Sequence, residues 1–436
     1  KLLVTMSLPM VISMIVQALY NIVDSIFVSR LSEDALTAVS MAFPMQNLMI
    51  SVAVGTGVGI NAMLSRALGE KKFEAANKTA ENGIFIEVLG YVLFLLIGIF
   101  VTKPFFLAQA GAGDIANMGI EYTRICLLMS FGIFMQIGFE RILQSTGRTI
   151  FTMITQSTGA IINIIRDPIL IFGLFGMPKM GVAGAAIATV TGQICAAILA
   201  ITFNLTKNPD VHISFKGFKP QIIFVKNILS VGIPSIIMSS VGSAMTFGMN
   251  KILITFSSTA VAVFGVYFKL NSFVFMPVFG LNGMVPIVSY NYGAQNKKRL
   301  TKTIKLAIMY AVCIMFIGIM LFQFIPDVLL KLFDASDHML EIGIPALRVI
   351  SLSFAFAGIC IVISSSLQAL GHGFLSMMIS ITRQLIILLP SAYILAKFGG
   401  IHAVWWSFNI AEIGSLTLSL LFFKHMYNKI IKHLGE

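Results

Sequence analysis

The sequence predicts an all-α protein that crosses a membrane many times, and three observations support this fold class. Of its 436 residues, 57% are hydrophobic and only 11% are charged, which is more apolar surface than a water-facing domain can hide. Apolar runs of about 20 residues, the length that a helix needs to cross ~30 Å of hydrocarbon, recur along the chain. The two halves of the chain also repeat one another, as described below.

The apolar runs predict twelve transmembrane helices. Their ranges are 2–28, 36–62, 84–107, 122–145, 150–174, 181–204, 223–256, 259–289, 304–326, 345–370, 375–397 and 400–423. The polar stretch 205–222 is the one clear linker. We therefore expect an N-terminal lobe (residues 1–204), a cytoplasmic linker (205–222) and a C-terminal lobe (223–436), with six spans in each lobe and a short cytoplasmic tail at the end.

Lysine and arginine predict the orientation of these spans. Nineteen of them fall in the segments on the side that holds both chain termini, and five fall on the opposite side. Because basic residues are enriched in cytoplasmic loops, both termini are expected in the cytoplasm. The same distribution explains most of the net charge of +12, so that no nucleic-acid partner is needed to account for it.

Four ordered correspondences show that the two halves are related. They are Pro9 with Pro234, Gly69 with Gly293, Gln144 with Gln368, and Gly181 with Gly400, at offsets of 225, 224, 224 and 219 residues. An even number of spans per half gives parallel repeats. Two such bundles normally meet across a central cleft near the midplane of the bilayer, which is the architecture of a transporter.

Two of the predicted spans carry acids at membrane depth. Tyr20, Asn21 and Asp24 share one face of the first span, and Asn163 and Asp167 share one face of the fifth. Both acids lie roughly 25–30 Å from the cytoplasmic ends of their helices, so we expect them to face each other. Two such carboxylates, with amide and phenol neighbours, bind a proton or surround a Na⁺ ion with oxygen ligands.

The repeat provides an internal control for this site. Asp167 falls opposite Leu389, and Asp24 falls opposite Met249, whereas the proline that follows Asp167 has a partner in Pro390. If the acids served only to pack a bundle, traces of them would be expected in both halves. The asymmetry favours an ion site in the first half alone.

Other charged or glycine-rich positions have simpler interpretations. Glu140, Arg141 and Arg148 flank the cytoplasmic end of the fourth span and are expected to orient it, while Arg166 is unexplained. The sequence leaves open whether Lys269 and Glu412 pair. The glycine-rich run 55–59 looks like a phosphate loop, but it follows no strand and is interpreted as close helix packing.

Four motifs resemble the multidrug and toxic compound extrusion (MATE) family. They are L-Y-N-I-V-D-S-I-F-V at 19–28, N-x-x-x-D-P at 163–168, G-V-A-G-A-A-x-A-T at 181–189, and the paired Q-x-x-G motifs. The resemblance covers essentially the whole chain and is greatest to the MepA-type pumps of Gram-positive bacteria. It implies two pseudo-twofold-related six-helix lobes, and export of amphipathic, often cationic drugs in exchange for H⁺ or Na⁺.

The resemblance also implies roles for individual residues. The DinF-like branch of the family has a cation site in its N-terminal lobe, and the matching positions here are Tyr20, Asp24, Asn163 and Asp167. A threonine of the sixth helix contributes to that site, and either Thr189 or Thr191 matches it. Pro9 matches a proline implicated in bending of the first helix. The NorM-like branch instead uses acids on the seventh and tenth helices, where this sequence has none within the spans.

The resemblance further implies a substrate cleft between the lobes, lined by the first, second, seventh and eighth spans. The candidate lining residues are Gln17, Gln46, Asn47, Met245, Asn271, Phe275 and Met276. Methionine and phenylalanine suit varied apolar cations because they are flexible or polarisable. Each of these positions also admits the plainer interpretation of core or lipid-facing filler.

The predicted protein is thus a monomeric drug antiporter of the bacterial plasma membrane, with a role in antibiotic resistance. Its partners are small-molecule drugs and membrane lipids, and it needs no cofactor or metal beyond H⁺ or Na⁺ as the coupling ion. A lipid-linked oligosaccharide flippase of the same superfamily is the alternative, although extra spans and a more cationic cavity are not evident. An enzyme is not expected, since no Walker motif, nucleophile elbow or clustered histidines occur.

Overall fold

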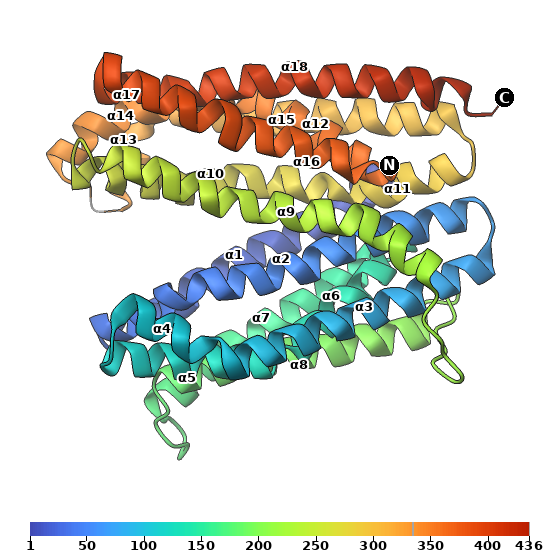
Figure 1. Cartoon of the computed structure of the whole chain (residues 1–436), viewed down its shortest axis with the longest axis horizontal. Helices are drawn as coiled ribbons and strands as arrows, with labels where there is room; N and C mark the ends of the chain where they lie inside the picture. Colours follow the sequence, from blue (N-terminus) through green and yellow to red (C-terminus); the bar gives the residue numbers. More distant parts are fainter. Residues whose placement is uncertain (334, 436) are drawn as a thin grey trace. The chain divides into compact units, whose positions relative to one another are not determined.

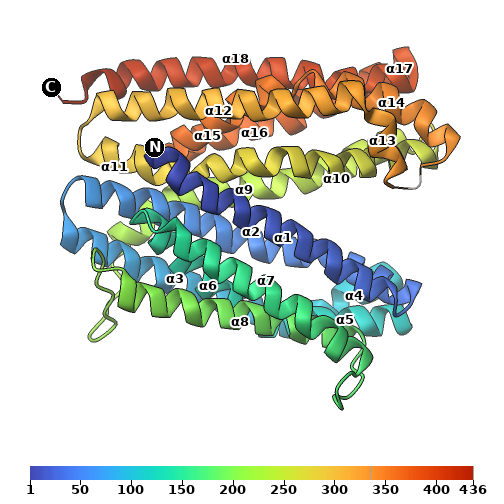
Figure 2. The ribbon, with the colours of Figure 1, turned by 180° about the vertical axis from the view of Figure 1, so that it is seen from behind.

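The structure is a computed structural model that describes residues 1–333 and 335–435, with the side chain of Glu33 excluded. All regular secondary structure in this part of the chain is helical, and within each half of the sequence the long helices lie side by side (Figures 1 and 2). The predicted fold class, an all-α protein with many membrane spans, is confirmed.

The first half of the sequence forms eight helices. They are α1 (Leu2–Ser29), α2 (Glu33–Gly69), α3 (Phe73–Phe100), α4 (Thr102–Ala110), α5 (Asp114–Leu128), α6 (Phe131–Ser145), α7 (Thr149–Phe172) and α8 (Val182–Lys207).

The second half forms the remaining elements. They are α9 (Ile222–Leu253), α10 (Ser258–Gly280), η1 (Leu281–Gly283), α11 (Met284–Gly293), α12 (Lys297–Phe324), α13 (Pro326–Lys331), α14 (Asp337–Ser351), α15 (Phe354–Ala369), α16 (Gly373–Ile381), the π-helical segment η2 (Thr382–Leu388), α17 (Leu389–Val404), α18 (Trp406–Lys429) and η3 (Ile431–His433).

These helices account for all twelve predicted spans. In the described residues, nine helical segments are long and apolar enough to cross a membrane, and two bent pairs, α5 with α6 and α14 with α15, pass the same test together. Helix α7 has 24 residues and corresponds to the remaining span, the fifth. It falls outside that count because polar residues interrupt its apolar ones.

The structure adds detail to four of the predicted spans. The fourth and tenth spans bend by 43° and 50° at Met129–Ser130 and Leu352–Ser353. The eleventh span contains η2, Gly400 interrupts α17 with φ 74°, and α18 begins at Trp406. An apolar run gives the length of a span, but it carries no information about a switch in backbone hydrogen bonding within it.

The repeat between the halves is evident in the backbone and in its hydrogen bonds. Gly147 and Gly371, 224 positions apart, have φ of 80° and 85° in the same turn, a conformation that favours glycine. The hydroxyl of Ser65 donates to the carbonyl oxygen of Ser145 at 3.4 Å. The equivalent hydroxyl of Ser289 donates to the carbonyl oxygen of Ala369 at 2.7 Å. The same turn and the same contact are therefore built twice.

The chain divides into two compact units that exchange the first turns of one helix each. One unit, here called the N-unit, contains residues 12–236, and the other, here called the C-unit, contains residues 1–11 and 237–436. In the N-unit, α9 begins against Gly59 of α2, where a Cβ atom would collide with the carbonyl oxygen of Ile228. In the C-unit, α1 begins against Gly283, where a Cβ would lie 3.0 Å from Cα of Ser7.

The glycine-rich run of α2 explains the close approach in the N-unit. A Cβ at Gly55 would lie 2.5 Å from the side chain of Ile236, so both Gly55 and Gly59 admit α9. Gly57 lies between them and faces the other way, against the side chain of Arg141. The interpretation of this run as helix packing, rather than as a phosphate loop, is confirmed.

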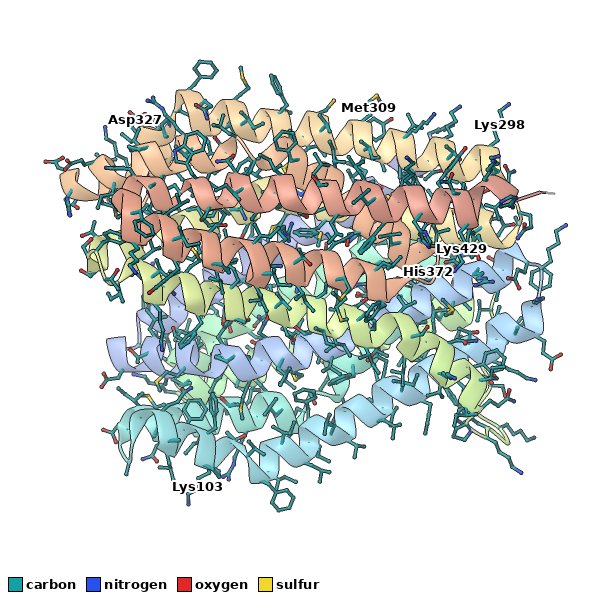
Figure 3. The ribbon with its side chains drawn as sticks, turned by 45° about the horizontal axis from the view of Figure 1, so that its top comes forward. Lys103, Lys298, Met309, Asp327, His372 and Lys429 are labelled. Carbon is teal, nitrogen blue, oxygen red and sulfur yellow. The ribbon has the colours of Figure 1, made fainter. Side chains whose placement is uncertain are left out.

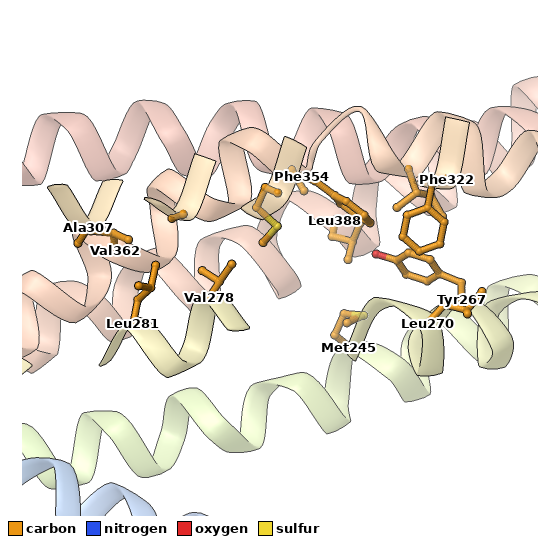
Figure 4. Packing of buried hydrophobic residues seen from close by; sticks show 14 of the residues in the cluster. Met245, Tyr267, Leu270, Val278, Leu281, Ala307, Phe322, Phe354, Val362 and Leu388 are labelled. Carbon is orange, nitrogen blue, oxygen red and sulfur yellow. The ribbon is translucent and has the colours of Figure 1, made fainter. Parts of the chain in front are cut away.

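The C-unit has the distribution of side chains expected of a membrane-spanning bundle. Lys298, Lys429 and His372 lie at one end of its helices and Asp327 at the other, while Met309 lies between them (Figure 3). Its core contains Phe354 and Phe322, whose rings meet edge to face with centroids 5.1 Å apart (Figure 4). These charged groups thus lie at the helix ends, and the part of the core around Phe322 and Phe354 is apolar.

Candidate cation site

Helix α7 turns a polar stripe towards the interior of the N-unit. Its buried residues include Thr152, Thr155, Gly159, Asn163 and Asp167, which recur at intervals of three and four and therefore share one helix face. Asp167 is fully buried. Arg166, next to it in sequence, is exposed on the outer side of the helix. Adjacent residues of a helix point about 100° apart, so Arg166 does not neutralise Asp167.

Helix α8 packs closely against this stripe through glycine. A Cβ at Gly192 would lie 2.6 Å from the carbonyl oxygen of Gly159 and 3.4 Å from Cβ of Asn163. A Cβ at Gly184 would lie 2.6 Å from the carbonyl oxygen of Leu170. The two helices are therefore antiparallel neighbours, and this register places Thr189 at the level of Asn163.

Helix α1 brings the second acid to this place. The ring of Phe27 meets that of Phe172 at the end of α7, edge to face, with centroids 6.5 Å apart. One turn earlier on α1, the carboxyl group of Asp24 interacts with that of Asp167. The structure thus brings together the two acids that the sequence singled out.

The polar atoms at this place lack partners. Oδ1 of Asp24, both carboxyl oxygens of Asp167, both amide atoms of Asn163 and Oγ1 of Thr189 are buried without a hydrogen bond. An unpartnered ionised oxygen costs several kcal/mol in an apolar interior. A proton, or a small cation with oxygen ligands, would remove that cost.

The donor set suits H⁺ or Na⁺ better than a transition metal. Carboxylate, amide and hydroxyl oxygens are ligands of hard cations. Among the described residues, no three His, Cys, Asp or Glu side chains are grouped so as to hold a metal ion. The chemistry that this geometry allows is reversible binding of a small cation.

Three further side chains surround Asp24, and two of them were not predicted. The predicted Tyr20 lies within electrostatic range of both acids. Tyr122 and Cys126 of α5, each 3% exposed, lie within the same range of Asp24. The sequence contains no signal for these two, because they begin an ordinary apolar span and their approach to α1 depends on tertiary packing.

Gln46, which was proposed for the substrate cleft, is engaged within the N-unit. Its Nε2 atom donates to the hydroxyl of Tyr122 at 3.2 Å and approaches Sγ of Cys126 at 3.5 Å. The tyrosine thereby connects Gln46 to the surroundings of Asp24. Asn47 is half-buried next to it in the chain.

The other predicted residues of α1 and α8 are placed as follows. Asn21, predicted for the cation site, and Gln17, predicted for the substrate cleft, are exposed on α1. The hydroxyl of Thr191 donates to the carbonyl oxygen of Ile187 at 2.7 Å, whereas that of Thr189 is buried without a partner. Of the two threonines, Thr189 is therefore the better candidate. Pro9 lies inside α1, in the portion that belongs to the C-unit.

The remaining substrate candidates belong to the C-unit. Met245 is 9% exposed and is part of the core shown in Figure 4. The ring of Phe275 packs edge to face on Phe354, with centroids 5.3 Å apart. Met276 is half-buried, and Oδ1 of Asn271 is buried without a hydrogen bond. Met245 and Phe275 thus have packing roles, and Asn271 keeps a free acceptor.

The positions equivalent to the two acids are apolar in the C-unit. Leu389 packs against α9, where a Cβ at Gly248 would lie 2.8 Å from its side chain. Met249, the counterpart of Asp24, is fully buried in the core of the C-unit. The same place in the repeat is therefore filled by hydrocarbon in one unit and by two carboxyl groups in the other.

Glu412 pairs with a residue that the sequence did not suggest. Its Oε1 lies 3.5 Å from Nη1 of Arg383, which η2 supplies. Lys269 is exposed, and its ammonium group lies 5.9 Å from the ring centroid of Phe333. The open question of a pair between Lys269 and Glu412 is thereby answered, because the cation beside Glu412 is Arg383.

Arg148 orients the end of the fourth span, as expected, whereas Glu140 does not. Arg148 forms an ion pair with Asp210 at 2.5 Å and donates to the carbonyl oxygen of Lys207 at 2.8 Å, so that the turn is tied to the linker. Glu140 is only 2% exposed. It lies inside the N-unit, where it accepts hydrogen bonds from α6 and α7.

Comparison with known families gives the same division of the chain. The sequence matches the MatE family over residues 9–169 and again over residues 234–394. The two matches are offset by 225 residues, as the internal repeat requires. Together they cover most of both halves.

Comparison with characterised proteins finds relatives along nearly the full length. The chain is 26% identical over 437 residues to the multidrug export protein MepA of Staphylococcus haemolyticus, covering 99% of this chain and 94% of the relative. It is 29% identical over 419 residues to MepA of Staphylococcus aureus, covering 94% and 90%.

Solved structures show the same fold. An outward-facing multidrug resistance MATE transporter of the MOP superfamily superposes with a TM-score of 0.94 at 27% identity, covering 99% of this chain and 96% of that one. A MOP superfamily transporter from Pyrococcus furiosus, described as having a binding pocket of reversed polarity, gives a TM-score of 0.93 at 26% identity. It covers 100% of this chain and 96% of that one.

Proposed function

The chain belongs to the MatE family, and from this premise we propose that it is a secondary active multidrug efflux antiporter. It exports amphipathic, often cationic compounds in exchange for H⁺ or Na⁺ by alternating access. Its named relatives are multidrug export proteins, which supports the substrate class. The Lys and Arg distribution supports a plasma-membrane protein with both termini in the cytoplasm.

The observation that carries the coupling part of the proposal is the unpartnered pair Asp24 and Asp167. The two carboxyl groups come from different helices, and together with Asn163 they leave buried oxygens that no protein group satisfies. A site that is costly when empty and ionised is stabilised by a proton or by Na⁺. Occupancy of the site therefore changes the free energy of the contact between α1 and α7.

This dependence supplies a route from ion binding to conformational change. An ion shifts a two-state equilibrium only by the difference in its affinity for the two states. The contact between α1 and α7 is one in which such a difference arises, because separation of the helices divides the ligand set. We propose that filling the site favours one access state and emptying it favours the other.

The test is transport by the purified full-length protein in liposomes. Ethidium movement is followed under a pH gradient alone, a Na⁺ gradient alone, and neither. We expect one of the two gradients to drive ethidium against its concentration, which names the coupling ion. Asp24→Asn should abolish the driven component while the protein still inserts and remains folded. Equal transport with and without both gradients would contradict antiport.

A further inference from the structure

A second buried charged cluster lies in the N-unit, apart from the Asp24–Asp167 site. It consists of Glu87 on α3 with Glu140 and Arg141 on α6, and it is here called the Glu87 cluster. Both glutamates are nearly inaccessible, with exposures of 1% and 2%. The proposed exchange at Asp24 does not require any of these residues.

Glu140 has the hydrogen-bond partners that an ionised carboxylate requires. The hydroxyl of Thr155 donates to its Oε1 at 2.6 Å, and Nε2 of Gln136 donates to the same oxygen at 3.1 Å. Nε2 of Gln156 donates to its Oε2 at 2.9 Å. Three donors on one carboxyl group satisfy a carboxylate, which only accepts hydrogen bonds.

Glu87 has the opposite surroundings. Neither of its carboxyl oxygens has a hydrogen bond partner, although the side chain is buried. It lies against α6 at Gly138, where a Cβ would be 3.0 Å from Cγ of Glu87. An ionised carboxylate without a donor is costly at such a place.

The charges of the cluster do not balance when both acids are ionised. Arg141 lies within electrostatic range of Glu87 and Glu140, and these two are the charged groups that act on it. Arg141 is in turn the charged group that acts on each glutamate. One guanidinium therefore faces two carboxyl groups, and the cluster is neutral only with one additional positive charge.

We propose that Glu87, Glu140 and Arg141 form a second proton-binding site in the N-terminal half of the transporter. Three hydrogen-bond donors and the charge of Arg141, acting at a distance, stabilise Glu140 as a carboxylate, and Glu87 carries the exchangeable proton. On release, the O–H bond of Glu87 breaks and the proton passes to water, leaving a carboxylate that shares Arg141 with Glu140. On uptake, water or hydronium returns the proton to the same oxygen.

The position of the cluster relates it to the cation site. Thr155, which holds Glu140, lies on the same face of α7 as Asn163 and Asp167. The eight residues from Thr155 to Asn163 correspond to about 12 Å along the helix. Arg141 lies about one turn before the end of α6 at Ser145. Its Nη1 atom donates to Oε1 of Gln144 at 3.1 Å. A proton on Glu87 is thus held between the cation site and that helix end.

Infrared titration of the full-length protein tests the inference. Spectra of the wild type are compared with Glu87→Gln, with Asp24→Asn and Asp167→Asn together, and with Glu74→Gln. Glu74 is the matched control, because it lies on the same helix but pairs with Lys78 at the surface, at 2.9 Å. We expect Glu87→Gln to remove one carboxylic acid band that titrates in the wild type. The other variants should keep that band.

A second variant keeps the inference testable if Glu87→Gln does not fold. In Glu140→Gln, Arg141 is free to pair with Glu87, so the Glu87 acid band should disappear at lower pH than in the wild type. A Glu87 band that is unchanged over the whole pH range, or a full set of titrating bands in Glu87→Gln, overturns the proposal. The inference rests on the proposed function for its role in transport only, since the titration needs no substrate.

Discussion

The two units of this transporter contain the same helical repeat but place different chemistry at the same point of it. In the N-unit, α1 and α7 bring Asp24 and Asp167 together, and their buried oxygens lack partners. In the C-unit, the equivalent Met249 and Leu389 are apolar and pack in the core or against α9. The turns and hydrogen bonds at the ends of the fourth and tenth spans are nevertheless alike in both halves.

The comparison separates scaffold from function. Features present twice, such as the glycines with positive φ at Gly147 and Gly371, are requirements of the fold. Features present in only one half are not required by the fold, so they need another explanation. The pair of acids is the most costly unrepeated feature of α1 and α7, because charge within a membrane is expensive unless it serves a function or has a partner.

The largest expected effect distinguishes the two units directly. Asp167→Asn should lower ion-driven ethidium efflux by about 10-fold or more, within the range for loss of a coupling free energy of about 1–3 kcal/mol. The amide keeps the shape of the side chain but cannot gain or lose a proton. Leu389→Asn introduces the same residue at the equivalent place in the C-unit, and efflux by correctly folded protein should retain its dependence on the gradient. Rates are measured in liposomes at matched protein content.

Equal loss of gradient dependence in the two Asn variants would contradict a site confined to the N-unit. Loss of folded protein in Leu389→Asn would be visible by size-exclusion chromatography and would be a packing effect. The comparison is therefore made only between variants that elute as the wild type does.

The next effect concerns stability. Met249→Asp and Leu389→Asp together transfer the acid pair to the C-unit, where hydrocarbon surrounds both positions. We expect a loss of about 3 kcal/mol or more in the free energy of unfolding, because the C-unit provides no ligand set like that of Asn163 and Thr189. The loss should be smaller at low pH, where the new carboxyl groups are protonated. Thermal unfolding in detergent at two pH values measures it.

The sequence predicted the scaffold well because membrane helices follow from apolar length and repeats follow from spacing. It also identified Asp24, Asn163 and Asp167, since polar residues at helical spacing in an apolar span are conspicuous. Tyr122 and Cys126 were not identified, because a tyrosine or cysteine in an apolar span is unremarkable until its neighbours are known. Their proximity to Asp24 depends on the packing of α5.

The partner of Glu412 was not predicted for a similar reason. Depth in the membrane suggested Lys269, but the depth of a residue does not fix the direction in which its side chain points. Arg383 reaches Glu412 from η2, and a π-helical turn shifts the residues that follow it around the helix axis. Sequence periodicity of 3.6 residues cannot anticipate that shift.

The ion pair of the C-unit gives a third, smaller effect. Glu412→Gln should lower the unfolding temperature more than Glu412→Gln combined with Arg383→Gln, because the single change leaves a cation without its partner. We expect the free energies of unfolding of the single and double variants to differ by about 1–2 kcal/mol. This is below the value for a fully buried pair, since both side chains are partly exposed. Efflux should keep its dependence on the gradient in the double variant. An equal loss of stability in the single and double variants would show that the pair contributes nothing.

The last prediction compares how closely the repeated scaffold is packed in each unit. Gly59 and Gly283 are equivalent, and each admits the first turns of a helix from the other half of the sequence. A methyl group at Gly59 would meet the backbone oxygen of Ile228, whereas one at Gly283 would lie 2.9 Å from the hydroxyl of Ser7, which can rotate away, and 3.0 Å from its Cα. We expect Gly59→Ala to destabilise the protein by about 1–3 kcal/mol and Gly283→Ala by less. Thermal unfolding of the two variants in the same detergent measures the difference, and equal shifts would mean that the exchanged helix turns are packed alike in both units.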